Sequence, residues 1–278
     1  MNEIWQRRIE QSKIRISAKK QRAKYKNVLL KAGIVIFILY LFFPQYFRRA
    51  VYPYLYGKPL ASELQISTED YFEDVTASMF SYQHGDRQYL LQPRTKYSVT
   101  GRVGFVDDYT TIRNLIFRGQ FQKNYINLVP RDIFLVIGTM AHPDVFKMFE
   151  FAHEERMGQI LCKGVKYNKS FVPVWMNEEE YQKNQRIYTN CMKYMKNDEL
   201  NNYHPIPANN RINKALSMLL PGDVVYLEGV LVDVPQLGLH TGTRKSQQHK
   251  DQVVSGYEAG MCFILYTTKI AVNGRVYE

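Results

Sequence analysis

The residues best suited to chemistry lie in one short motif, Tyr203–Asn209, with the sequence YHPIPAN. His204 is the side chain in this motif that can change its charge near neutral pH, so it could act as a base or hold a ligand. A carboxylate such as Asp223 or Glu228 would then have to orient its ring. In the structural alternative, the two prolines stiffen the entry into a helix and His204 makes a local hydrogen bond. The sequence assigns His204 no partner, so no catalytic residue is predicted, and His204 with Asp223 is kept as the catalytic alternative.

A basic loop offers a second candidate site, for an anion. Arg244 and Lys245 lie in a long loop expected over residues 235–260. His204 and Asn209 precede the expected N-terminus of a helix, where backbone N–H groups favour negative charge. These four residues are the anion- or ligand-binding candidates. The alternative is a solvated basic loop.

Neither a metal site nor a cofactor is predicted. The chain contains no G-x-G-x-x-G, Walker A or G-x-S-x-G motif. His142 and His153 are too far apart in sequence for a zincin motif, and Cys162 and Cys191 do not form a C-x-x-C pair.

The three cysteines leave two possibilities open. Cys162 and Cys191 flank one irregular insertion, so they are the favoured pair if a disulfide forms. Three buried thiols are the alternative. Cys262 lies in a strand-like run and is expected to pack as a small hydrophobic residue.

Strands of mixed character, with helices between them, must position these residues. Asp223–Val234 is the strongest strand pattern, and Gly229 at its middle suits a strongly coiled strand. Met261–Val272 is the second, and Asn273-Gly274 after it is typical of a two-residue hairpin. Further elements are expected from periodicity and capping. They are strands at 96–105 and 133–138, and helices at 144–156, 177–200 and 210–219, the last capped by Asn209. The predicted domain is α+β or mainly β, a small bent OB-like or SH3-like barrel with inserted helices.

The N-terminal region reads as a membrane anchor. Val28–Phe43 is apolar except for Lys31, and residues 1–26 hold nine Lys or Arg and two acidic residues. Such a pattern predicts an uncleaved signal anchor with its N-terminus in the cytoplasm. A buried core helix and a cleaved signal peptide are the alternatives. The anchor would contact the bilayer through Val28, Ile34, Ile36, Leu39 and Phe43.

These patterns divide the chain into four expected parts. They are a basic cytoplasmic tail at 1–26, a transmembrane helix at 27–47, a connector with the start of the domain at 48–94, and a β-rich domain at 95–278 in the bacterial periplasm. Residues 1–26 carry +7 of the chain's net charge of +11, so the domain is nearly neutral. A nearly neutral domain without a recognised binding motif argues against a nucleic-acid partner.

The C-terminal third resembles an uncharacterised family of single-pass, membrane-anchored bacterial proteins. The matching stretches are His204–Asn209, Gly222–Val232, Thr243-Arg244 and Gly260–Tyr266, and the resemblance as a whole covers about seventy residues of the chain. The chain departs from the family at loop residues 245–257 and at Phe263, where an acidic residue is expected after the cysteine. The resemblance implies an anchored extracytoplasmic domain, and no catalytic residue.

The leading functional hypothesis is a non-enzymatic component of a larger envelope complex. It would be held in the inner membrane by residues 27–47 and would bind other membrane or periplasmic proteins. Abundant tyrosine, common at interfaces, and the polar helix expected at 177–200 favour this hypothesis. The competing hypothesis is an envelope hydrolase or ligand-binding enzyme that uses His204 with a nearby carboxylate. No small-molecule substrate is identified.

Overall fold

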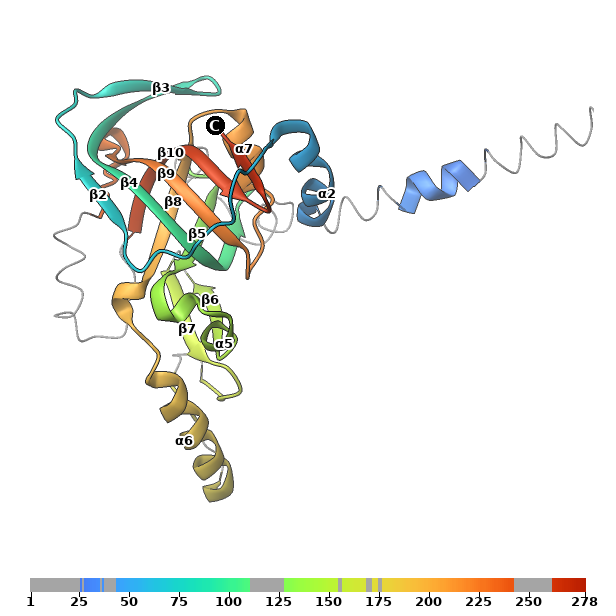
Figure 1. Cartoon of the computed structure of the whole chain (residues 1–278), viewed down its shortest axis with the longest axis vertical. Coiled ribbons are helices and arrows are strands. Elements are labelled where there is room, and N and C mark those ends of the chain that lie inside the picture. Colours follow the sequence, from blue (N-terminus) through green and yellow to red (C-terminus); the bar gives the residue numbers. More distant parts are fainter. Residues whose placement is uncertain are drawn as a thin grey trace, which may run out of the picture. The chain divides into compact units, whose positions relative to one another are not determined.

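A computed structural model describes residues 26, 28–35, 37, 44–110, 128–154, 157–168, 172–174, 177–242 and 262–278 (Figure 1). Two compact units make up the chain, Met1–Ala50 and Val51–Glu278. The second unit contains the strands. Its described helices are α2 (Pro44–Tyr56, which begins in the first unit), α5 (Pro143–Phe146), α6 (Glu178–Met192) and α7 (Asn210–Leu216), with 3-10 turns η1 (Gly138–Ala141), η2 (Asn197–Glu199) and η3 (Pro235–Leu237).

The unit is rich in strands, several of which alternate between buried and exposed positions. The described strands are β1 (Lys58–Pro59), β2 (Tyr71–Asp74), β3 (Phe80–His84), β4 (Arg87–Asp108), β5 (Arg131–Val136), β6 (Phe149–Glu154), β7 (Met157–Cys162), β8 (Leu200–Pro207), β9 (Val224–Asp233), β10 (Cys262–Val272) and β11 (Arg275–Tyr277).

Within the described residues, β4, β5, β8, β10 and β9 form a closed ring. β4 pairs with β5 and β9, β5 pairs with β8, and β9 pairs with β10, all antiparallel. The parallel pair of β8 and β10 closes the ring. β1, β2, β3 and β11 extend the sheet at its margins. Inside the ring, alternate apolar side chains of the strands pack into one core that includes Tyr97, Tyr203, Leu227 and Phe263.

The predicted membrane anchor is wrong. None of the helices in the described part of the chain is both long enough and apolar enough to cross a membrane. Of the expected lipid-facing residues, Val28 and Ile34 are exposed, whereas Ile36, Leu39 and Phe43 lie outside the described residues. The predictions of a transmembrane, single-pass protein with a signal anchor are therefore wrong, and so is the predicted location in the inner membrane and periplasm.

The predicted fold class is therefore also wrong. The sequence predicts a transmembrane helix followed by a small bent OB-like or SH3-like barrel. The structure instead shows a mainly β unit with few helices, built on a closed ring of strands.

The long strand β4 shows how this ring bends. Its pairing with β5 shifts register between Val103 and Phe105, at Gly104. Val103 therefore packs inside the ring, whereas Phe105 packs against Phe134 in a second cluster outside it.

The segment after β5 differs most from its predicted secondary structure. The helix expected over 144–156 is only α5, and Phe149–Glu154 is instead strand β6, paired with β7. Apolar and polar residues alternate along FEFAHE as they do in a strand, and the wider segment also has helical spacing. Periodicity alone therefore does not decide between a helix and a strand here. Figure 1 shows β6, β7 and α6 together at one side of the main sheet. Cys162 on β7 and Cys191 on α6 form a disulfide there, which was one of the two possibilities left open by the sequence.

Candidate functional site

The candidate site lies on the outer face of three neighbouring strands, β5, β8 and β10. Side chains alternate along β8, so Tyr203 packs inside the ring while Asn202 and His204 face outward. His204 lies in the middle of a strand and not in a loop before a helix, as the motif suggested. Pro205 and Pro207 fit into this strand because β5 pairs only with residues 200–203, which leaves β10 as the neighbour of the prolines.

His204 is held by a buried carboxylate that the sequence analysis did not identify. Nδ1 of His204 lies 2.6 Å from Oδ1 of Asp132, which is the second residue of β5. Both side chains are buried, with exposed fractions of 5% for His204 and 0% for Asp132. The other carboxylate oxygen, Oδ2, accepts a hydrogen bond of 2.5 Å from the hydroxyl of Tyr109. Asp132 is thus fixed from two directions and orients the ring of His204.

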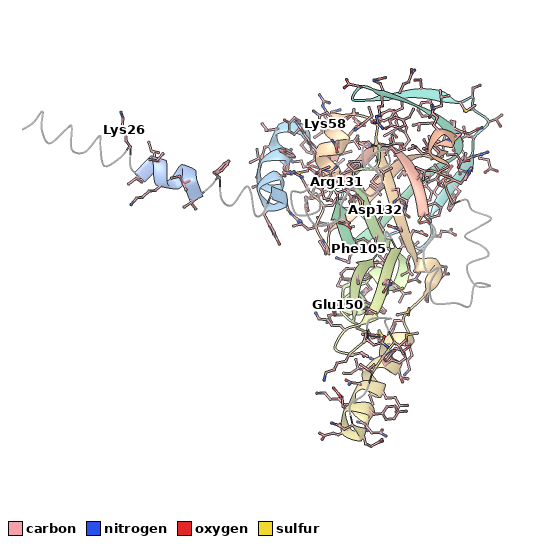
Figure 2. All side chains as sticks on the ribbon, turned by 180° about the vertical axis from the view of Figure 1, so that it is seen from behind. Lys26, Lys58, Phe105, Arg131, Asp132 and Glu150 are labelled. Carbon is pink, nitrogen blue, oxygen red and sulfur yellow. A yellow bond between two sulfur atoms is a disulfide. The ribbon has the colours of Figure 1, made fainter. Side chains whose placement is uncertain are left out.

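A rigid ion pair supports this arrangement from the neighbouring position on β5. Arg131 is buried, and its Nε donates to Asp108 at 3.1 Å, while Nη1 donates to Asn213 on α7 at 2.6 Å. Figure 2 shows Arg131 and Asp132 within the main sheet, with Glu150 of β6 farther along the unit. These contacts fasten the start of β5 to β4 and α7, so Asp132 has little freedom to move.

Cys262 is the remaining member of the candidate site, beside His204. It is the first residue of β10, its thiol is free and exposed, and its side chain is hydrogen-bonded to His204. Because Nδ1 of His204 faces Asp132, Nε2 is the ring nitrogen that remains for the sulfur. The backbone carbonyl of Cys262 accepts a hydrogen bond from the amide of Gly242, which ties the strand end in place. The expectation that Cys262 packs as a buried hydrophobic residue is wrong.

The environment of His204 favours its cationic form. Burial lowers the pKa of His204, but the charge and hydrogen bond of Asp132, together with the hydrogen bond to Cys262, outweigh burial and raise that pKa to about 9. At neutral pH, His204 therefore carries a positive charge, with Asp132 on one side of the ring and Cys262 on the other.

This shift predicts that the free energy of unfolding depends on pH. His204 binds its proton more tightly in the folded state than in the unfolded state, where its pKa is near 6.5. Its contribution is complete below pH 6.5 and is lost as the pH rises through 9, by about 3 kcal/mol in total. Urea unfolding of the intact protein and of His204→Gln at pH 6 and pH 9.5 measures the effect. Equal pH dependence in the two proteins would contradict it.

The other predicted site residues serve local structure or lie elsewhere. Asp223 accepts a hydrogen bond from the backbone amide of Leu220, on a turn before β9, and β9 is not a neighbour of β8 in the ring. Glu228 accepts from the hydroxyl of Tyr226, and Asn209 caps α7 by accepting from two backbone amides. None of these three is brought to His204 by a described contact. Arg244 and Lys245 lie outside the described residues.

The arrangement of Tyr109, Asp132, His204 and Cys262 has the elements of nucleophilic catalysis: an exposed thiol, a histidine beside it and a carboxylate that orients the histidine. Among the described residues, no group of three His, Cys, Asp or Glu side chains has the geometry of a metal site. Comparison with known proteins adds no identification: no protein-family model, no curated protein and no solved structure matches the chain.

Proposed function

We propose that this protein is a thiol-dependent enzyme of acyl transfer or hydrolysis, with Cys262 as its nucleophile. The observation that carries the proposal is the hydrogen-bonded row from Tyr109 through Asp132 and His204 to the exposed Cys262. The three roles of nucleophile, proton carrier and orienting carboxylate recur on unrelated folds wherever acyl groups are transferred. The sequence pairs His204 with Asp223 as a catalytic alternative, and in the structure Asp132 takes the place of Asp223.

In the first half of the reaction, the thiol of Cys262 gives its proton to solvent water, and the resulting sulfur anion attacks the carbonyl carbon of an ester or amide. A carbon–sulfur bond forms, the carbonyl electrons move onto oxygen, and the bond to the leaving group breaks as the carbonyl reforms. His204, cationic at neutral pH, gives its proton to the departing alcohol or amine. The positive charge on His204 also lies against the sulfur while that atom is anionic.

In the second half, His204 is neutral and can accept a proton from water. The resulting hydroxide attacks the thioester carbon, the carbon–sulfur bond breaks, and a carboxylic acid and the sulfur anion are released. Asp132 stays ionised throughout. Its role is to hold Nδ1 of His204 and to stabilise the cationic ring.

A burst experiment with p-nitrophenyl acetate tests the proposal. Cys162 and Cys191 are joined in the disulfide, so Cys262 is the free thiol of the chain. We expect one equivalent of p-nitrophenol to be released rapidly per chain, followed by slower turnover, and mass spectrometry to locate the acetyl group on Cys262. The Cys262→Ser variant is expected to give no burst. Acetylation no faster than that of free N-acetylcysteine would refute the proposal.

The role in a protein complex that was expected from composition stays a prediction. Its membrane setting is not part of the present proposal, because the anchor on which it depended is overturned.

A further inference from the structure

The two oxygens of the Asp132 carboxylate have different partners. Oδ1 faces Nδ1 of His204, whereas Oδ2 accepts a hydrogen bond from the hydroxyl of Tyr109. Tyr109 directly follows β4, where its backbone amide donates to the carbonyl of Pro130 at 3.0 Å. The side chains of Tyr109 and Asp132 are both buried, so bulk water does not compete for the hydrogen bond between them. Tyr109 is thus fixed through its backbone and through its hydroxyl.

The hydroxyl of Tyr109 draws negative charge away from the oxygen that holds His204. A carboxylate shares one negative charge between its two oxygens, and a donor at one oxygen stabilises the charge there. The attraction between Oδ1 and the cationic ring of His204 is therefore weaker with the Tyr109 hydrogen bond than without it. When the hydroxyl is removed, Asp132 has one donor fewer, and His204 gives up its proton only at a higher pH.

The two halves of the proposed reaction need opposite charge states of His204. Transfer of the acyl group to Cys262 uses the cationic ring, which is the form present at neutral pH. Hydrolysis of the thioester uses the neutral ring, which accepts a proton from water. A group that makes His204 release its proton more readily therefore accelerates the second half of the reaction and has little influence on the first.

Charged and titratable side chains on the neighbouring strands also act on the ring of His204. Within the described residues, those nearest to it in the strand register are Asp107 and Asp108 of β4, Arg131 and Asp132 of β5, and Cys262 of β10. Asp108 and Arg131 form a buried ion pair and so largely balance each other's charge. All of these groups are kept when only the hydroxyl of Tyr109 is removed, so that change isolates the effect of one hydrogen bond.

We infer that Tyr109 is a positioning residue for hydrolysis of the thioester: through Asp132, its hydroxyl allows His204 to be neutral, and so to accept a proton from water, at a lower pH. The inference rests on the proposed function, since it assigns a residue to the second half of the same reaction. Tyr109 acts on the reacting atoms only through Asp132 and His204.

The rate at which acetyl-Cys262 is hydrolysed measures this role. The protein is acetylated with p-nitrophenyl acetate and freed of reagent at pH 6, and mass spectrometry then follows the loss of the acetyl group between pH 6 and pH 10. Hydrolysis of S-acetyl-N-acetylcysteine at each pH is subtracted. In Tyr109→Phe we expect the midpoint of the pH profile to rise by about half a pH unit, which slows hydrolysis about threefold below the midpoint. The burst rate of acetylation at pH 7 is expected to change by less than about twofold, because His204 is cationic there in both proteins.

Tyr226 provides a matched control. Its hydroxyl also donates to a carboxylate, that of Glu228, and Tyr226 lies on β9 opposite Ala271, at the far end of β10 from Cys262. Tyr226→Phe is expected to leave both the midpoint and the burst rate unchanged. An unmoved or lowered midpoint in Tyr109→Phe, or equal slowing of acetylation and hydrolysis, would mean that Tyr109 is only structural, and the inference would be overturned.

Replacement of Tyr109 by 3-fluorotyrosine tests the same role if Tyr109→Phe does not fold. Fluorine makes the phenol a stronger hydrogen-bond donor and nearly keeps the shape of the ring, so the midpoint is expected to fall. A rise or an unmoved midpoint in this variant contradicts the inference. If the intact protein is acetylated no faster than free N-acetylcysteine, the proposed function itself is refuted. A normal burst with an unmoved midpoint refutes only the role of Tyr109, so the two failures are distinguishable.

Discussion

Acylation of Cys262 by p-nitrophenyl acetate is expected to slow roughly 100-fold at pH 7 when His204 is replaced by glutamine, since positioned acid–base groups contribute effects of that order. Glutamine can still donate an amide hydrogen to Asp132, so the buried carboxylate keeps a partner. It carries neither the positive charge nor the transferable proton of His204. Both the sulfur anion and the departing group therefore lose their stabilising neighbour.

The burst rate measures this effect directly, and a second histidine serves as control. His84 lies on β3, is half-buried and stacks on Tyr82, whose ring packs against Tyr266, four residues along β10 from Cys262. His84→Gln is expected to leave the burst rate unchanged. Circular dichroism and thermal melting of both variants report whether the fold is kept. A reduction of less than threefold in a folded His204→Gln variant would mean that His204 does not take part in the reaction.

Those parts of the fold that depend on neighbouring residues could be predicted from the sequence. The alternation of Asp223–Val234 and the apolar run to Val272 correspond to β9 and β10. Asn273-Gly274 forms the tight connection to β11, with φ values of 54° and 67° that suit this pair of residues. In each case the signal and the structure are local.

The site could not be predicted, because nothing local links its members. Asp132 and His204 are separated by 72 residues and meet only because β5 pairs with β8. Cys262 joins them through the parallel pairing of β8 with β10, which the sequence does not specify. The motif draws attention to His204, but its prolines suggest the entry into a helix, so the sequence directs the search for a partner to the residues that follow, such as Asp223 and Glu228. An available signal was Asp132 itself, a charged residue at the start of a fully buried strand.

The apolar N-terminal run shows a different kind of error, in which a local pattern predicts more than the structure contains. Composition and flanking charge predict a transmembrane helix over residues 27–47, although the apolar run itself extends only from Val28 to Phe43. A local pattern was thus extended to a conclusion about location that required a continuous helix. The described helices do not provide one.

Replacing Gly229 by alanine is expected to destabilise the folded state by about 4 kcal/mol, or to prevent folding. Gly229 is in the middle of β9, between β4 and β10. A Cβ atom added there would lie 2.0 Å from the carbonyl oxygen of Tyr266 and 3.1 Å from the Cα of Thr267. These are backbone atoms, so no side chain can rotate away, and the pairing of β9 with β10 would have to open.

The same substitution at Gly85 separates crowding from the general cost of replacing glycine. Gly85 lies in the turn between β3 and β4 with a φ of 59°, and an added Cβ would meet nothing within 4 Å. Gly85→Ala is expected to cost only about 1 kcal/mol, the usual penalty for a left-handed backbone. Urea unfolding of both variants measures the difference as a shift in midpoint at constant slope. Equal losses would mean that β9 and β10 are not closely packed at Gly229, and this would contradict the pairing of β9 with β10 in the closed ring.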